Sequence, residues 1–516
     1  MSAGAKGNGT ADDSAVMLSM ISLCPSGQVI YLPPGNYLFK TNFFISKSIA
    51  IRGAGPSQTS ITACFNPAFY FTTPNSRFYG NQYVANLTGG YTKGSTNLTI
   101  DTSALNSYFT VGNGLLIDQV NDGTFVNAVG NEGLCTYCSR SNGLRCLNQF
   151  VVLTGVSGPN ITIDTPLYWS YSNSLNPQVT WFPGPNLSNA GVEDLRINDY
   201  FATNSIGSYN STIFFFYCTG CWARNLGLQF GHRDHIGLYN SYHCVVRDCY
   251  FLHSQSYKSL SYGIELVNST CACLFENNIF DDLACSVVIG WGANGNVFAY
   301  NYSTNNVFTP PNWNPEVFAV HDAHAMMNLF EGNVAADIMM DFVHGSSSHQ
   351  TLFRNCLAGW QPGRDAQCLA IASATANTYN NIVGNVLGTP GQSTQYMLTN
   401  APYSVNLRGI YAFGYYGLTS SLTNYDTNVF PSTLIHGNYD YVTQHTNWDS
   451  SISDHTLPTS YYLTSRPTWW TNWGSTPWPP IGPDLPGMTN KIPSQLRFSS
   501  MMGNRPPPPT GLRTGP

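Results

Sequence analysis

Leu274-Phe-Glu-Asn-Asn-Ile-Phe280 is the stretch that decides the fold, because variants of it recur through the middle of the chain. Five further copies are Val245-Val-Arg-Asp-Cys-Tyr-Phe251, Val297-Phe-Ala-Tyr-Asn-Tyr302, Leu329-Phe-Glu-Gly-Asn-Val334, Leu352-Phe-Arg-Asn-Cys-Leu357 and Asn381-Ile-Val-Gly-Asn-Val386. Aligned on Asn278, Asn301, Asn333 and Asn385, they are 29, 23, 32, 23 and 29 residues apart. Such periods are typical of solenoids, whose repeats bury their apolar faces by stacking. The short, Val-, Ile- and Phe-rich copies predict strands, and therefore an all-β parallel β-helix.

The composition supports a stacked sheet and excludes several partners. Charged residues make up 9% of the 516 residues, against ~25% in typical soluble domains, which suits strands whose like charges would repel along a ladder. The hydrophobic content of 42% favours a core over disorder. The net charge is −6 and there is no basic run, so we expect no nucleic-acid binding. No apolar stretch approaches the ~20 residues of a membrane helix.

The 14 cysteines predict disulfide bonds and a secreted protein. Cys135, Cys138 and Cys146 crowd one loop, and Cys218 lies close to Cys221. Residues 1–6 lack the apolar core of a signal peptide, so this start fits a cytosolic protein or the mature form of a secreted one, and the cysteines favour the second.

A second interpretation makes the cysteines small core residues stacked between repeats. It rests on the alignment of Cys244 with Cys273 and of Cys249 with Cys356. A zinc site is a third and weaker choice, because no second Cys-x-x-Cys stands at the required spacing.

Three segments near the N-terminus follow one another closely: Gly7-Asn-Gly-Thr-Ala-Asp-Asp-Ser-Ala-Val16, Gly27-Gln-Val-Ile-Tyr-Leu-Pro-Pro-Gly-Asn-Tyr37 and Ile51-Arg-Gly-Ala-Gly55. Together they resemble the opening of pectate-lyase-superfamily proteins, which also occurs in β-helical glucanases and phage tailspikes. The resemblance covers about 60 residues and implies a right-handed parallel β-helix with an N-terminal cap helix, over roughly Asp13 to Leu23. A cap is also what the open end of a solenoid requires.

We expect the β-helix to span residues 1–457, with extra strands and long loops in 61–190. Regular rungs resume at Val192-Glu-Asp-Leu-Arg-Ile197. Residues 458–516 are rich in Trp and Pro, which predicts an extension that packs along the helix without strands. The last ~15 residues are expected to be disordered.

The repeated asparagines predict a ladder in which each amide bonds the next and satisfies the backbone of a turn. The resemblance places this turn between the second and third strands of each rung. The inserted residues then fall after the third strand, in the loops His253-Ser-Gln-Ser-Tyr-Lys-Ser259, Thr309-Pro-Pro-Asn-Trp-Asn-Pro315 and Trp360-Gln-Pro-Gly-Arg-Asp365. In pectate-lyase-like enzymes the active groove lies beside this wall, along the first strand.

The first-strand segments are the most polar ones in the chain. Holding the ladder in register puts His321 and His344 in one column, ~5 Å apart on adjacent rungs. His and carboxylate groups repeated on one stripe suit acid–base chemistry on a bound polymer. The candidate catalytic residues are His321, Asp322, His344, Asp341, Asp281, Asp282, Glu265 and His235. The sequence leaves open whether His321 points outward.

Several of these residues also have structural interpretations. Asp281 and Asp282 faintly resemble the paired aspartates of polygalacturonases, but the rest of that pattern is missing and they suit a turn equally well. The aligned pairs Arg247/Glu276 and Glu331/Arg354 are interpreted as surface ion pairs.

The favoured function is an enzyme that cleaves a polysaccharide in a side-wall groove, with Trp291, Trp313, Tyr257, Lys258 and Arg364 binding the sugar. A hydrolase is slightly favoured over a lyase, because few Lys or Arg are available to hold a uronate chain. A non-catalytic adhesin or spike is the other alternative. We predict no cofactor and name no metal ligand. A Ca²⁺ site stays open as an alternative, because the calcium-site aspartates and Arg base of pectate lyases cannot be placed. A monomer is favoured, since no trimerising coiled coil is present.

Overall fold

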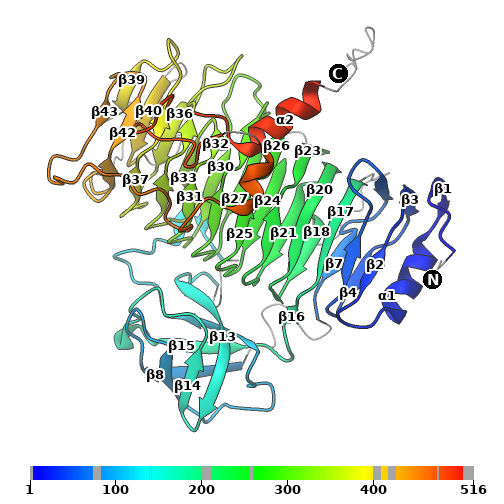
Figure 1. The fold of residues 1–516 in the computed structure, drawn as a ribbon. Coiled ribbons are helices and arrows are strands. Elements are labelled where there is room, and N and C mark those ends of the chain that lie inside the picture. The colour runs from blue at the N-terminus through cyan, green and yellow to red at the C-terminus, as the bar shows by residue number, and fades with distance from the viewer. Residues whose placement is uncertain are drawn as a thin grey trace.

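The computed structural model describes residues 4–73, 83–136, 138, 140, 142–199, 211–255, 260–398, 408–415, 426–473 and 476–503. Figure 1 shows a long stack of strands, a separate barrel beside it and a C-terminal segment along one side. The predicted all-β parallel β-helix is therefore confirmed. No helix among the described residues is long and apolar enough to cross a membrane.

One side of the stack is an eleven-stranded parallel sheet, here called the groove sheet. It contains the polar segments that the sequence assigns to the first strand of each rung. In spatial order its strands are β4 (Phe43–Ile45), β7 (Phe69–Phe71), β18 (Ser211–Phe216), β21 (Asp234–Tyr239), β24 (Tyr262–Val267), β27 (Cys285–Ile289), β30 (Phe318–Asp322), β33 (Ile338–His344), β36 (Cys368–Ser373), β40 (Arg408–Phe413) and β39 (Gln395–Leu398).

The other strands of the rungs form a 22-stranded sheet, in which the long strands β17 (Gly191–Asp199) and β20 (Trp222–Gly231) join two columns. The second-strand column contains β2 (Val29–Tyr31), β5 (Ala50–Arg52), β22 (Val245–Arg247), β25 (Leu274–Glu276), β28 (Val297–Ala299), β31 (Leu329–Glu331), β34 (Thr351–Phe353), β37 (Asn381–Val383) and β41 (Leu434–His436). The third contains β1 (Asn8–Asp12), β3 (Gly35–Phe39), β6 (Thr59–Ala63), β23 (Tyr250–Ser254), β26 (Ile279–Asp281), β29 (Tyr302–Thr304), β32 (Val334–Ala335), β35 (Cys356–Leu357), β38 (Val386–Leu387), β42 (Asn438–Asp440) and the antiparallel β43 (Thr446–Asn447).

Stacked aromatic rings form much of the core inside the rungs. Phe275, Phe298 and Phe330 lie in one column with ring centroids 4.9 and 5.1 Å apart, close to the ~4.8 Å spacing of parallel strands. At the N-terminal end, helix α1 (Ser14–Leu23) buries Met17 and Ile21 against this core. The predicted cap helix is therefore confirmed.

The asparagine ladder is present in the turn between the second and third strands. Asn278, Asn301 and Asn333 follow one another, each accepting a backbone N–H bond of about 3.0 Å from the preceding rung. The next rung contributes Asn355, not Cys356, so the steps around it are 22 and 30 residues. A second ladder, which the sequence did not predict, runs through Asn296, Asn328, Gln350 and Asn380 at the turn before the second strand.

This shift of one residue corrects two predicted pairings. Glu331 lies opposite Phe353 rather than Arg354, and Arg354 instead binds Asp484 of the C-terminal segment at 2.7 Å. The pair Arg247/Glu276 is confirmed by its register and by a distance of 3.8 Å. Cys249 occupies the ladder position and does not align with Cys356.

Most of the cysteines fit the second interpretation, in which they are small core residues rather than disulfide partners. Cys135 and Cys138 form a disulfide bond, while the other twelve cysteines are unpaired thiols. Cys218 and Cys221 are among these thiols and belong to the β-helix core, as do Cys244 and Cys273. The disulfides predicted for Cys146 and for Cys218–Cys221 are therefore absent.

Residues 83–181 contain extra strands, but these form a separate barrel, which the prediction of extra strands and long loops in 61–190 did not include. Six antiparallel strands close into a barrel: β8 (Tyr83–Gly89), β9 (Asn97–Ile100), β10 (Gly114–Asp118), β13 (Asn148–Ser157), β14 (Asn160–Ile163) and β15 (Gln178–Trp181). They enclose a core of their own that includes Leu115, Val151 and Trp181. The barrel strands pair with each other, so they carry none of the repeat that marks the rungs.

Short elements complete the description. The barrel carries the hairpin β11 (Val129–Gly130) and β12 (Gly133–Leu134) and the 3₁₀ helix η1 (Asn173–Leu175). The strand β16 (Leu187–Ser188) pairs in parallel with β19 (Cys218–Thr219).

The C-terminal segment packs along the 22-stranded sheet, as predicted. It includes η2 (Thr468–Trp473) and α2 (Pro493–Gly503), and no strand lies within its described residues from 458 to 503. Trp470 is fully buried against Tyr300, and Tyr462 donates a 2.7 Å hydrogen bond to Glu276. Residues 504–516, where disorder is predicted, lie outside the described residues.

Candidate active site

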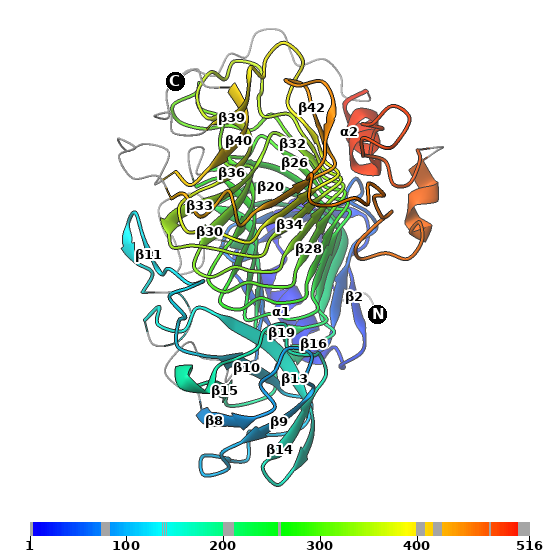
Figure 2. The same cartoon turned by 90° about the vertical axis from the view of Figure 1, so that its left-hand side faces the viewer.

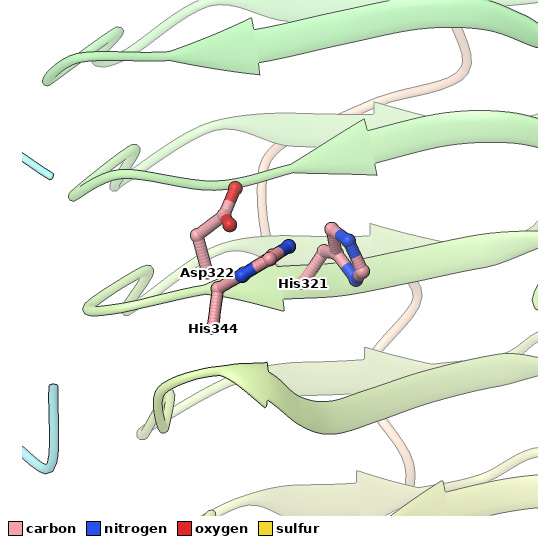
Figure 3. Close-up of side chains that lie close together, drawn as sticks. All are labelled: His321, Asp322 and His344. Atoms are coloured by element: carbon pink, nitrogen blue, oxygen red, sulfur yellow. The ribbon is translucent and has the colours of Figure 1, made fainter. Parts of the chain in front are cut away.

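Two histidines and two aspartates meet on neighbouring strands of the groove sheet. His321 and Asp322 end β30 and His344 ends β33 (Figure 3). Asp341 also lies on β33. Val320 pairs with Met340, but the next pair joins Asp322 to His344, because a bulge gives β33 two extra residues. The sequence aligned His321 with His344, so the observed register corrects that alignment by one residue while keeping the two rings together.

The alternation of side chains along the two strands settles which of them face outward. Val320 and Met340 point into the β-helix core, and successive side chains of a strand point to opposite faces. His321 and Asp341 therefore face outward. The His321 and His344 side chains remain 26% and 21% exposed, respectively, so both can contact a molecule from solution.

Direct contacts hold this cluster together. His321 donates a hydrogen bond of 2.5 Å from Nδ1 to Oδ2 of Asp341. The His321 and His344 rings lie edge to face with centroids 4.9 Å apart, matching the predicted ~5 Å spacing. Oε2 of Glu132 approaches Nε2 of His344 at 3.6 Å. Asp322 is 5% exposed and packs over Gly290 of the preceding rung, where any Cβ would collide with its carboxylate.

The two imidazoles differ in charge. Burial alone would lower the pKa of His321, but the carboxylates of Asp341, Asp322 and Glu316 outweigh it and raise the pKa to about 10. Burial and the neighbouring cationic His321 lower the pKa of His344. At neutral pH the metal-free cluster therefore holds one imidazolium beside one neutral imidazole.

Glu316 adds a third carboxyl to the cluster. It precedes β30 and lies close to His321 and Asp341, with ligand atoms of the three within 4.8 Å. Burial raises the pKa of Glu316 well above its usual value, and the adjacent carboxylate of Asp341 raises it further. Two neighbouring carboxyls do not readily ionise together, so both effects favour the protonated form of Glu316.

A cleft of about 600 Å³ adjoins the cluster. Glu132 lies on one wall, and Pro310, Trp313 and Glu316 lie on the other. The floor is formed by residues of three strands of the groove sheet and includes Met339, Asp341, Ala372 and Ala412. The cleft reaches the histidines through Asp341, Glu316 and Glu132.

The barrel supplies the wall that contains Glu132. Figure 2 shows β11 beside β30 and β33, and the backbone N–H groups of Asn131 and Glu132 donate to Phe342 and Val343. Gly130 packs so tightly on β33 that an added Cβ would lie 2.5 Å from the backbone nitrogen of Gly345. The loop that carries this hairpin is fixed by buried ion pairs of Arg140 and Arg145 with Asp118.

Glu265 lies on the same outward face, two strands before β30, but it has a partner of its own. Arg233 forms ion pairs with Glu265 and, at 3.0 Å, with Asp234. Burial and the nearby Asp234 raise the pKa of Glu265 to about 8. We interpret Glu265 as a residue held beside the cluster by an ion pair.

Three other candidates lie away from the cluster. His235 is fully buried against Phe251, and burial lowers its pKa to about 3. Asp281 accepts hydrogen bonds from Tyr250 and Asn305 on neighbouring rungs. Asp282 binds His253 at 2.7 Å, at the third-strand corner.

The predicted sugar-binding residues lie in different places. Trp313 lines the cleft, whereas Trp291 packs against the barrel core. Arg364 donates to backbone carbonyls of Asn306 and Pro311 and so joins two of the predicted wall loops. Tyr257 and Lys258 lie outside the described residues.

Sequence reasoning missed Glu316 and Glu132. Glu316 directly follows the predicted loop 309–315, so its place at the start of a first strand was a usable signal. Glu132 comes from the barrel, and no repeat in the sequence connects it with the rungs.

The described residues offer two sets of metal-ligating side chains. His321, Asp322 and His344 bring one ligand atom each within 4.8 Å of one another, and Glu316, His321 and Asp341 do the same. The first set is spread over two adjacent strands and includes both imidazoles.

Comparisons with known proteins agree with this fold. Residues 1–131 match the family model described as rhamnogalacturonase A/epimerase, pectate lyase-like, which confirms the resemblance at the N-terminus. Tailspike gp61 of Pseudomonas phage phi297 is similar in structure, with a TM-score of 0.54 and 12% identity over 85% of this chain and 74% of that one. Tailspike gp49 of Pseudomonas phage LKA1 has a TM-score of 0.51 and 10% identity over 80% and 68%. The curated proteins contain no match.

Proposed function

We propose that the protein is a carbohydrate-active enzyme that hydrolyses a polysaccharide in the cleft beside β33. The observation that carries this proposal is the convergence of His321, Asp322, Asp341 and His344 on two adjacent strands, at the edge of a cleft. A binding module has no need for such a cluster, because flat aromatic and amide side chains suffice to hold a sugar. Partly exposed groups with strongly shifted pKa values beside a cleft favour catalysis.

Glu316 is the proposed proton donor to the leaving sugar. It lines the cleft and its pKa is raised well above the usual value by burial and by Asp341. A hydrolase requires one carboxyl that keeps its proton and a second that is ionised, and unlike environments separate the two. Asp341, which lines the cleft beside Glu316, is the proposed second carboxyl.

The charges of the cleft favour hydrolysis over elimination. Glu132, Glu316 and Asp341 line it, and none of its described lining residues is Lys or Arg. A lyase must hold and neutralise a uronate carboxylate, which such a lining would repel. We therefore expect a glycan that is neutral at the cleaved bond. A polymeric glycan substrate also fits the expectation that the protein is secreted.

A panel of neutral and uronate-rich polysaccharides from plants, algae and microbes tests this proposal. We expect new reducing ends from a neutral polymer, without the ultraviolet absorbance of an unsaturated uronate product. That absorbance would instead indicate a lyase. Binding of a polymer with no product after long incubation would contradict an enzymatic function and favour a glycan-binding spike or adhesin.

A further inference from the structure

We propose that His321, Asp322 and His344 bind one divalent transition-metal ion of the zinc class. Their ligand atoms lie within 4.8 Å of one another, so small side-chain rotations bring all three to the ~2.1 Å bond lengths of a metal site. Figure 3 shows the three side chains meeting between two adjacent strands. This proposal concerns binding alone and does not depend on the hydrolase assignment.

The surrounding carboxylates orient both imidazoles for this role. Asp341 holds Nδ1 of His321 at 2.5 Å, so Nε2 is the nitrogen that would bind the ion. Glu132 lies 3.6 Å from Nε2 of His344, which directs the Nδ1 side of that ring to the ion. A carboxylate behind a ligating histidine is the usual arrangement in metal sites, because it fixes the ring and increases its basicity.

The donor set selects the class of metal. Two imidazole nitrogens and one carboxylate suit Zn²⁺, Co²⁺, Mn²⁺ or Fe²⁺, whereas Ca²⁺ and Mg²⁺ prefer all-oxygen sites. The alternative set of Glu316, His321 and Asp341 offers only one imidazole, whose Nδ1 already binds Asp341. The three-residue set is therefore preferred.

The local charge also favours a cation. The carboxylates of Glu132 and Asp341 lie beside the three ligands, in addition to Asp322 itself. The guanidinium of Arg233, on the same face of the groove sheet, is engaged by Asp234 and Glu265. Three protein ligands leave at least one coordination position open toward the cleft, as in metal sites that bind water or substrate.

Metal binding to the whole chain tests this inference. Chelator-treated protein is titrated with Zn²⁺ alone by calorimetry and with Co²⁺ alone by visible absorption. We expect one ion per chain and a Co²⁺ spectrum of a low-coordinate site. Asp322→Ala and His344→Ala should each weaken binding at least tenfold. His253→Ala is the matched control, because His253 also pairs with an aspartate but lies at another corner.

Asp341→Asn separates a ligand site from a folding defect. This variant keeps both imidazoles and nearly the shape of the side chain, and its melting temperature is checked first. Loss of the carboxylate behind His321 should weaken Zn²⁺ binding about 10- to 100-fold. Absence of stoichiometric binding by the wild type, or unchanged binding by folded Asp322→Ala and Asp341→Asn, would overturn the inference. Neither result depends on finding a polysaccharide substrate.

Discussion

Glu316 is the residue on which the proposed chemistry most depends. Replacing it by Gln keeps its size and a hydrogen-bond donor toward Asp341 but removes the transferable proton. We expect Glu316→Gln to lower the rate of polysaccharide cleavage by about 10²- to 10⁴-fold with little change in folding. Rates of reducing-end release by purified variants check this, with Asp282→Asn as the control because Asp282 lies away from the cluster. Equal losses in both variants would count against the acid role.

His321 predicts a pH dependence of stability in the chelator-treated protein. Its pKa is raised from 6.5 to about 10 in the folded state, so folding is favoured by binding this proton. The stabilisation is complete below pH 6.5 and is lost as the pH rises to 10, by roughly 5 kcal/mol. Urea unfolding across this range should show a steeper decline for the wild type than for His321→Gln. Parallel profiles would refute the pKa shift.

At the scale of residues, the sequence predicted the two histidines together with Asp322 and Asp341, but it missed Glu316 and Glu132. The asparagine ladder fixed the alignment of the rungs with one another, so His321 and His344 were predicted to be neighbours. The direction of His321 depends on which residues of β30 face the core, and the register of His344 depends on a bulge within β33; neither leaves a mark in the repeat. Glu132 reaches the site through a separately folded barrel, a long-range contact that strand periodicity cannot indicate.

The asparagine ladder is the element that fixes the register of the rungs. Asn301 donates to the carbonyl of Phe275 and to Asn333, and it accepts from Asn278. We expect Asn301→Ala to reduce the free energy of unfolding by about 2–4 kcal/mol, because it leaves buried backbone groups without partners. Denaturant unfolding measures this. Asn428→Ala, at an exposed asparagine outside the ladder, should change stability by less than about 0.5 kcal/mol.

The ladder also explains why one rung was aligned wrongly. Leu352-Phe353 was matched to Leu329-Phe330 by residue type, whereas Leu352 lies opposite Phe330. Leu and Phe fill the same core position, so hydrophobicity does not distinguish the two registers. Only the amide of Asn355 fits the turn, where it bonds the backbone of Asn333.

For the whole molecule, the cleft depends on how the barrel docks on the groove sheet. A larger residue at position 130 would collide with the backbone of β33. We expect Gly130→Val to displace the hairpin that carries Glu132 and to lower the rate of polysaccharide cleavage at least tenfold. The far-ultraviolet circular dichroism spectrum of the β-helix should stay unchanged. Gly123→Ala is the control, because its Cβ would meet nothing within 4 Å. Full activity of folded Gly130→Val would show that the barrel wall is dispensable.

The central claim is that cleavage occurs at the cluster of Glu316, Asp341 and His321. The most direct measurement is a crystal structure of Glu316→Gln with an oligosaccharide of the substrate identified by the panel. We predict a sugar chain along the cleft, with a glycosidic oxygen at about 2.6–3.2 Å from the side chain of residue 316. A chain bound on another face, with the cleft empty, would contradict this account.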